Sequence, residues 1–323
     1  MANGDERLPM TPRPIRGGSL REGELPGVAA VAWRASGRAS ESLFAQGVRR
    51  LRRSTTALIG LGVVVVLIVV ALFADVLAPQ SPTANDQTQM FGRPSWEHPL
   101  GTDQMGRDML SRAIYGTRIS LLVGVSSVLL ALFVGVPFGL IAGYYGGRAD
   151  SVIMRVMDLI LAFPIFLLAI ILMVIFTPTA GLIGTMKVSG AIAIVRIPIY
   201  ARLVRGSVLS IKEKEYIEAC RALGVRNPMI LLRHVLPNCM APIIVTTTLG
   251  IATSIIVEAT LSFLGLGTQP PTPSWGWDLK ANVSFIQSNA WLSLFPGLAI
   301  FVTVLGFNLF GDGLRDALDP RLK

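Results

Sequence analysis

The sequence predicts an all-α membrane protein with six transmembrane helices. Its 323 residues are 52% hydrophobic and only 15% charged, which is unlike the balance of a soluble globular domain. Six apolar stretches are long enough to cross the roughly 30 Å hydrocarbon core of a bilayer as helices. The formal net charge is +9, and lysine and arginine collect on the cytoplasmic side of membrane proteins. This sidedness explains the charge better than nucleic-acid binding, which we do not expect.

Residues 1–55 are predicted to form a basic, mostly disordered tail on the cytoplasmic side. They are rich in Gly, Pro, Ser and Ala, carry ten arginines and show no sustained hydrophobic period. The apolar stretch 56–78 follows an arginine cluster, which should hold the N-terminus inside, and it is predicted as the first transmembrane helix. The stretch 79–116 is polar, rich in Pro and Gly, and too long for a tight connection. It is therefore expected to complete the 56–116 region as a small extracytoplasmic subdomain.

The remaining spans make residues 117–312 a five-helix membrane core. Their expected ranges are 118–142, 152–176, 187–207, 241–264 and 291–311. Pro164 should kink the third span, and Arg155 and Asp158 are three positions apart and can pair near its start. Residues 313–323 are expected to form a cytoplasmic tail. With both termini inside, most of the 29 lysines and arginines fall on the cytoplasmic side, which agrees with the positive-inside rule.

One polar interruption, residues 212–238, lies between the fourth and fifth spans and is called the polar segment below. It reads KEKEYIEACRALGVRNPMILLRHVLPN and is too charged to lie in hydrocarbon. Its first part has good helix formers, and Gly224 suits the left-handed position that ends a helix. Asn227 suits the N-cap of a second short helix and Pro228 its first position, and Pro237 should limit that helix. The pattern predicts a compact helix–turn–helix at the membrane surface.

On pattern alone, the simplest interpretation of the polar segment is a solvated loop with two amphipathic turns. A DNA-binding helix-turn-helix is a poorer one, because predicted membrane spans flank the segment closely. The residues themselves are more specific. Glu218-Ala219-Cys220, then Gly224, then Leu236-Pro237 resemble the EAA loop of ABC-importer permeases at every spacing. Two positions depart from that pattern, since Cys220 replaces an alanine and His234 stands where the pattern has isoleucine.

Four other stretches resemble the oligopeptide, dipeptide and nickel branch of these permeases. They are His98–Gly124, RVMDLILAFP, EATLSFLGLGTQPPTPSWG and GDGLRDALDPRLK. The resemblance covers nearly everything from residue 50 onward and implies the type I ABC importer permease fold, in a bacterial or archaeal cell membrane. It implies that this chain is the second permease subunit of a heterodimer. The other implied partners are two cytoplasmic ATPase subunits, an extracytoplasmic substrate-binding protein and membrane lipid.

The resemblance makes the polar segment a coupling helix that docks into a groove on the cytoplasmic ATPase. The residues assigned to ATPase coupling in this way are Glu215, Glu218, Ala219, Gly224, Arg233, Leu236 and Pro237. ATP and Mg²⁺ would be bound by the partner ATPases, because this chain has no G-x-x-x-x-G-K-[ST] loop. It also has no G-x-S-x-G and no H-E-x-x-H. We therefore expect a transporter subunit without a catalytic site, cofactor or metal of its own.

Two charges, Arg196 and Glu258, fall well inside predicted spans. A charge at that depth is costly and should face the bundle interior or a water-filled path. Lining of the translocation path and a purely structural role in helix packing both stay open for each residue.

The substrate also stays open. The resemblance favours peptides, whereas permeases for nickel or another small solute share the same motifs. A secondary transporter driven by an ion gradient is a less favoured alternative. It should show internal repeats or a midplane ion site built from broken helices, and neither is clear in the sequence.

Overall fold

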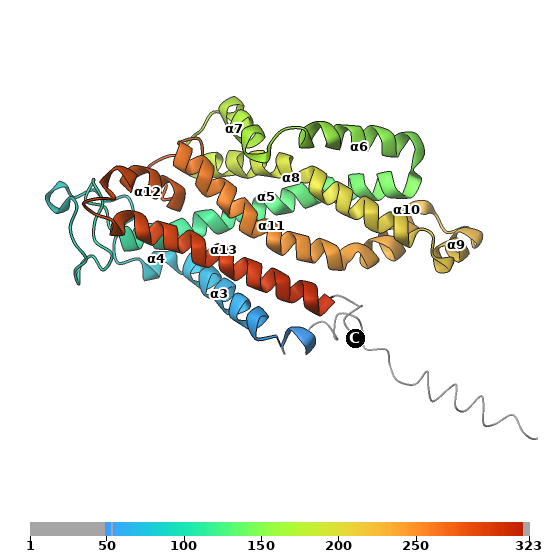
Figure 1. The fold of residues 1–323 in the computed structure, drawn as a ribbon, viewed down its shortest axis with the longest axis horizontal. Helices are drawn as coiled ribbons and strands as arrows, with labels where there is room; N and C mark the ends of the chain where they lie inside the picture. The colour runs from blue at the N-terminus through green and yellow to red at the C-terminus, as the bar shows by residue number, and fades with distance from the viewer. Residues whose placement is uncertain (1–48, 53, 319–323) are drawn as a thin grey trace, which may run out of the picture. The chain divides into compact units, whose positions relative to one another are not determined.

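The fold is a helical bundle, as the composition predicts. The computed structural model describes residues 49–52 and 54–318, of which residues 54–318 lie in one compact unit. Apart from helices, the regular structure of this part consists of two isolated bridges, Thr102–Asp108 and Ala180–Gln269. Figure 1 shows long helices lying side by side, with α12 at one end of the bundle and α9 at the other. Of the predicted tail 1–55, residues 1–48 and 53 lie outside the described residues, as do the last five residues of the chain.

Five long helices build the bundle. They are α3 (Thr55–Leu72), α5 (Met109–Tyr145), α8 (Gly181–Ile211), α11 (Leu236–Leu264) and α13 (Trp291–Leu318). The shorter elements are α4 (Ala74–Leu77), η1 (Gln87–Gln89), α6 (Gly147–Leu161), α7 (Ile165–Phe176), α9 (Glu215–Ala222), α10 (Asn227–Ile230), η2 (Leu231–Val235), α12 (Trp275–Asn282) and η3 (Val283–Phe285).

The predicted spans are recovered as five continuous helices and one bent pair. Each of the five is long and apolar enough to cross a membrane. Because α10, η2 and α11 follow one another without a gap, the span that contains α11 extends from Asn227 to Leu264. The predicted third span is instead α6 followed by α7, with an angle of 88° between them. Pro164 stands at this break and caps α7. Its ring removes a backbone donor and disfavours a helical residue before it, so the expected kink is a full break.

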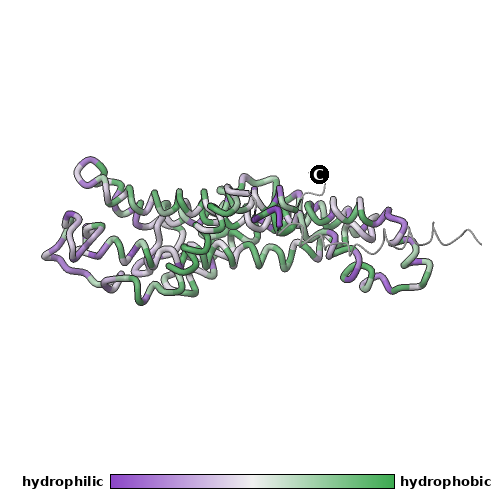
Figure 2. The backbone as a smooth tube through the Cα atoms, turned by 90° about the horizontal axis from the view of Figure 1, so that it is seen from below, coloured by the Kyte–Doolittle hydropathy of each residue, from purple (hydrophilic) through white to green (hydrophobic). Residues whose placement is uncertain are grey.

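The hydropathy of the chain follows the same arrangement. In Figure 2 the hydrophobic stretches occupy the middle of the bundle and the hydrophilic ones gather at its two ends. The helices reach beyond the apolar stretches that predicted them, because polar residues outside the hydrocarbon can continue a helix. The expected tail at 313–323, for example, is helical up to Leu318.

Glycines allow α5 and α8 to approach closely. Gly135, Gly139 and Gly143 recur every four residues on α5 and face α8. A Cβ atom on Gly139 would lie 2.5 Å from the carbonyl oxygen of Ala201, and one on Gly135 would lie 2.7 Å from that of Ile197. Small residues at this spacing let two membrane helices pack backbone to backbone. This contact fixes α8, which carries Arg196 and leads into the polar segment.

A buried ion pair holds α12 against the start of α5. Arg112 donates to Oδ1 of Asp278 from Nε at 2.8 Å and from Nη2 at 2.5 Å, and both side chains are almost fully buried. Trp275 adds a hydrogen bond from Nε1 to the carbonyl oxygen of Ala113 at 3.0 Å. The polar loops at this end are therefore tied to the membrane helices.

Two further ion pairs join α6 to α8. Arg205 donates to both carboxylate oxygens of Asp150 at 2.5 and 2.6 Å, and Arg202 donates to Asp158 at 2.5 Å. The predicted pairing of Asp158 with Arg155 is therefore wrong. An arginine on the neighbouring helix lies closer to this carboxylate than the one on its own helix, whose side chain is exposed.

Candidate functional site

The polar segment folds into short helices that are anchored on one side only. Ile217 of α9 and Ile230 of α10 are completely buried. They pack in one apolar cluster with residues of α5, α8 and α11, including Tyr144, Val208 and Cys239. The segment is therefore attached through an apolar side to three of the long helices, so that a force applied to it would be passed to the bundle.

The turn between α9 and α10 has the geometry that the sequence predicts. Gly224 has φ +74°. Its N–H donates to the carbonyl oxygen of Arg221 at 2.9 Å, and the N–H of Val225 donates to that of Cys220 at 3.1 Å. These bonds form the motif that satisfies the last carbonyls of a helix through a left-handed glycine. A Cβ atom at position 224 would meet nothing within 4 Å, so glycine is needed for its backbone conformation and not for space.

Two details at the end of the polar segment differ from the expectation. Asn227 is the first residue of α10, and Arg226 takes the N-cap position. Pro237 does not end a helix but lies in the first turn of α11. The turn before it, η2, is π-helical, with the N–H of Leu236 bonded to the carbonyl oxygen of Leu231. A π-helical turn changes the hydrogen-bond register, which lets the chain pass a residue without an N–H and run from α10 into α11.

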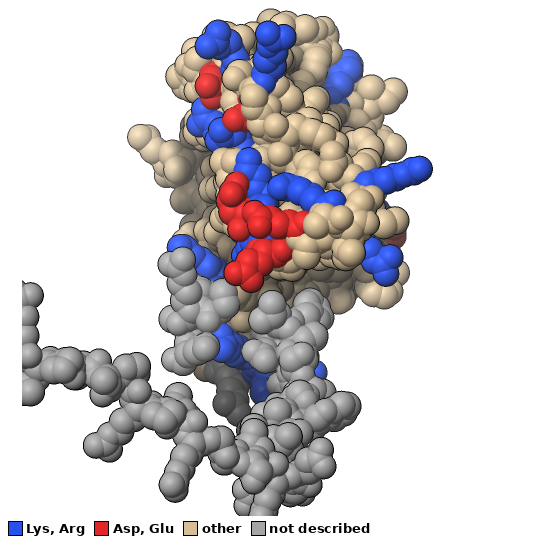
Figure 3. All heavy atoms as spheres, turned by 90° about the vertical axis from the view of Figure 1, so that its right-hand side faces the viewer, with Lys and Arg blue, Asp and Glu red and all other residues tan. Residues whose placement is uncertain are grey.

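Most residues assigned to ATPase coupling lie on the free side of the segment. Those with exposed side chains are Glu215, Glu218, Ala219, Arg233 and Pro237, and Gly224 is exposed as well. Leu236 is half-buried and packs against the apolar cluster. Figure 3 shows this end of the molecule, where basic side chains surround a smaller acidic group. The arrangement offers a charged, outward-facing surface on a fixed support.

The free side also carries large apolar residues that the sequence analysis did not single out. Leu223 is 82% exposed, Met229 53% and Leu232 64%. Leu223 caps the end of α9, Met229 lies in α10 and Leu232 in η2, and none of the three belongs to the apolar cluster. Large apolar residues in an otherwise polar stretch are the sequence feature that could have identified them. Apolar side chains surrounded by charges are typical of surfaces that bind another protein.

A tyrosine at the end of α5 joins the two parts of the polar segment. The hydroxyl of Tyr144 donates to Oδ1 of Asn227 at 3.0 Å and accepts from Nε of Arg221 at 3.4 Å. The guanidinium of Arg221 also lies 5.1 Å from the centre of the tyrosine ring. No local pattern in the sequence marks Tyr144 for this role, since its partners are about eighty residues away.

Arg196 lines a hollow of about 450 Å³ between α7, α8 and α11. Its Nη1 donates to Oγ1 of Thr253 at 2.7 Å. The walls are otherwise mostly apolar, with Ile165, Phe166 and Ile199 among them. The structure thus places Arg196 where a solute could reach it.

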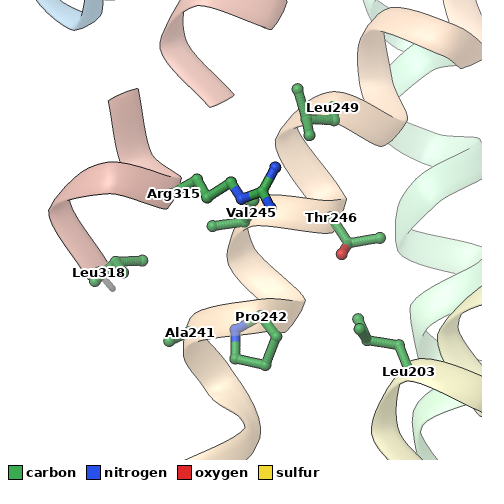
Figure 4. Close-up of a pocket in the computed structure, with 8 residues that line it drawn as sticks. All are labelled: Leu203, Ala241, Pro242, Val245, Thr246, Leu249, Arg315 and Leu318. Carbon is green, nitrogen blue, oxygen red and sulfur yellow. The ribbon is translucent and has the colours of Figure 1, made fainter. Parts of the chain in front are cut away.

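A second hollow, also about 450 Å³, lies beside the first on α11 and shares Thr246 and Leu249 with it. In Figure 4 the side chain of Arg315, from α13, points toward α11 near Val245 and Leu249. The two hollows follow one face of α11, and each is lined by one arginine.

Glu258 is completely buried and does not line either hollow. Its Oε1 accepts hydrogen bonds from Ser262 at 2.7 Å and from Ser274 at 2.9 Å, and its Oε2 accepts a longer one from Ser120 at 3.5 Å. These serines belong to α11, to the residue before α12, and to α5. Of the two roles considered for Glu258, this geometry favours helix packing.

Within residues 49–52 and 54–318, no group of three or more His, Cys, Asp or Glu side chains is placed to hold an ion.

Comparison with known proteins places the chain in a family. Residues 135–323 match the family described as the binding-protein-dependent transport system inner membrane component. The chain belongs to this family of binding-protein-dependent permeases. Residues 42–94 match the N-terminal transmembrane domain of oligopeptide transport permease C. The resemblance found in the sequence is thereby confirmed.

Curated relatives of this permease match nearly their whole length. The dipeptide transport system permease protein DppC of Alkalihalophilus pseudofirmus is 46% identical over 87% of this chain and 91% of its own. The di/tripeptide permease DppC of Pseudomonas aeruginosa is 45% identical over 83% of this chain and 88% of its own. The glutathione permease GsiD of Pectobacterium atrosepticum is 46% identical over 85% of this chain and 90% of its own.

A solved structure supports the fold of the permease. One chain of the methionine ABC transporter MetNI, in an inward-facing conformation, aligns with a TM-score of 0.53 at 19% identity. The alignment covers 65% of this chain and 98% of that one. The predicted ABC importer permease fold is thus confirmed.

Proposed function

We propose that this permease forms half of the translocation path of an ATP-driven importer of short peptides. The observation that carries the substrate class is the identity of 45–46% to permeases named for dipeptides, di/tripeptides and glutathione, over more than four fifths of the chain. These solutes share a peptide backbone and at least one free carboxylate. Nickel or another small solute is the alternative substrate.

The polar segment is proposed as the element that docks on a cytoplasmic ATPase. It combines an apolar side fixed to α5, α8 and α11 with a free side that carries exposed charges and exposed Leu223, Met229 and Leu232. Movement of the docked segment would therefore move three long helices together. ATP and Mg²⁺ would be bound by two partner ATPases, and ATP would drive the change by binding one of two conformations more strongly.

The path is proposed to run along the face of α11 that carries the two hollows. Arg196 would be very costly on a lipid-facing surface at the depth of a membrane helix. This face therefore needs either water or another protein opposite it. A second permease subunit that covers the face would close the hollows into a path shared by a heterodimer.

The proposed orientation rests on charge and on the position of the chain ends. Ala57, near the start of α3, and Gly313, near the end of α13, are in contact, since a Cβ added at Gly313 would overlap the Cβ of Ala57. The two ends of the described bundle thus lie on the same side. We propose that this side and the basic α9 end face the cytoplasm, because Lys and Arg collect there. The α12 end would then meet the extracytoplasmic binding protein.

Uptake by the assembled transporter tests this function. Both permeases, both ATPases and the binding protein are reconstituted in proteoliposomes, and uptake of a labelled dipeptide is measured with and without ATP. ATP-dependent accumulation of the dipeptide is expected, with no accumulation of ⁶³Ni²⁺. Uptake of nickel and not of peptides would support the alternative, and peptide uptake driven by a proton or sodium gradient without ATP would contradict both.

A further inference from the structure

Arg196 holds a positive charge that the described part of the chain does not neutralise. No ion pair joins it to an acidic residue within 49–52 and 54–318. One of its N–H groups donates to Thr253, whereas its Nε is buried without a hydrogen-bond partner. A guanidinium has five N–H donors, and a buried donor without an acceptor costs free energy. Among the described residues, the groups that meet this guanidinium are the neutral hydroxyls of Thr253 and Tyr200. An anionic ligand would supply the acceptor that matches its charge.

The guanidinium is held in place from the α11 side. A Cβ atom on Gly250 would lie 2.7 Å from Nη2 of Arg196 and 2.9 Å from the hydroxyl oxygen of Tyr200. Glycine at this position thus lets the guanidinium lie directly against the helix backbone. Thr253, almost one turn further along α11, holds Nη1. The arginine is fixed on the wall of the hollow before any ligand arrives.

We propose that this hollow binds the free α-carboxylate of a peptide in transit, with Arg196 as its anion-binding group. The proposal rests on the peptide-import function argued above. A carboxylate matches a guanidinium in plane and spacing and can accept two parallel hydrogen bonds from it. The apolar walls suit peptide side chains, and the adjoining hollow at Thr246 and Leu249 gives room for the rest of a short peptide.

The test compares a dipeptide with its C-terminal amide. The assembled transporter is placed in nanodiscs without binding protein, and binding of L-alanyl-L-phenylalanine and of its amide is measured by saturation-transfer NMR. The wild type should bind the acid about tenfold more tightly than the amide, because one charge-assisted carboxylate pair adds on the order of a factor of ten. Arg196→Gln should remove this preference, and Arg196→Lys should keep part of it.

Arg202→Gln is the matched control, because Arg202 lies on the same helix but pairs with Asp158 outside the hollow. It should keep the acid-over-amide preference. The inference is overturned if the wild type shows no such preference or if Arg196→Gln retains it. It is also overturned if Arg196→Gln weakens acid and amide equally and releases the second permease on purification, since Arg196 would then pair with that subunit. A wild type that imports no peptide at all would instead overturn the proposed function.

Discussion

The hydroxyl of Tyr144, at the end of α5, donates a hydrogen bond to Oδ1 of Asn227 in α10 at 3.0 Å. The same hydroxyl accepts from Arg221 of α9. One side chain of a long membrane helix thus fixes both short helices that flank the Gly224 turn. If the polar segment passes motion between an ATPase and the bundle, this contact determines how rigidly it does so.

Tyr144→Phe should weaken this coupling while leaving the fold intact. The ring stays in the apolar cluster, but the hydroxyl and its two hydrogen bonds are lost, at a cost of about 1–2 kcal/mol. We expect dipeptide uptake per ATP hydrolysed to fall severalfold in proteoliposomes of the complete transporter. Tyr145→Phe, in the neighbouring residue that is 53% exposed, is the control and should behave like wild type. Equal uptake per ATP in both variants would remove the proposed role of Tyr144.

Gly224→Val should uncouple ATP hydrolysis from transport without preventing membrane insertion. A β-branched residue at φ +74° is strongly disfavoured, by about 1–3 kcal/mol, so the turn would change and α9 would shift relative to α10. Uptake should drop at least tenfold while ATP hydrolysis continues. Gly224→Asn is the matched variant, because asparagine tolerates the left-handed region and the site has space for a side chain. Wild-type uptake in Gly224→Val would show that the turn is only a connection.

Asp278→Ala should destabilise the α12 end of the bundle. It leaves Arg112 buried without its partner, and breaking a buried pair in this way costs about 3–5 kcal/mol. The thermal unfolding midpoint of the purified complex should fall clearly in a fluorescence assay. Asp75→Ala breaks the exposed pair with Arg118, for which about 0–1 kcal/mol is expected. A similar midpoint for both variants would mean that the Arg112–Asp278 pair contributes no more than a surface pair.

Cysteine labelling in intact cells should confirm the proposed orientation. Met90→Cys lies in the loop at the α12 end, where Met90 is 48% exposed, and should react with a membrane-impermeant maleimide. Asp316→Cys near the end of α13 is exposed in the structure but should react only after the cells are opened. Both cysteine variants are made in a chain that carries Cys220→Ala, because Cys220 is free and only half-buried and would itself react with the maleimide. Labelling of position 316 from outside would reverse the topology.

The purified chain alone should hydrolyse no ATP, because the sequence has no phosphate-binding loop of the G-x-x-x-x-G-K-[ST] type. Phosphate release by the isolated subunit should equal that of a control preparation from cells that lack the subunit. ATP hydrolysis should appear when the partner ATPases are added. Turnover by the subunit after removal of all ATPase partners would contradict the assignment.

Features that depend on local chemistry were available from the sequence. Membrane spans follow from runs of apolar residues, because a helix satisfies its backbone hydrogen bonds within itself and its apolar side chains can face lipid. The left-handed turn at Gly224 follows from the same kind of reasoning, because only a residue without a Cβ adopts positive φ freely. The coupling residues Glu218 and Ala219 were marked only by the resemblance of their spacing to the EAA loop, and exposed Leu223, Met229 and Leu232 were not marked at all.

Features that depend on contacts between distant residues were decided only by the tertiary structure. The sequence left Glu258 open between two roles, and only the structure shows that serines from α5 and from the residue before α12 meet its carboxylate, which favours packing. Asp158 pairs with Arg202 because α8 packs beside α6, a contact that the spacing of residues within α6 does not show. Tyr144 and Asn227 are 83 residues apart. Hydropathy and backbone preference act within a few residues, whereas these partners are set by how the long helices pack.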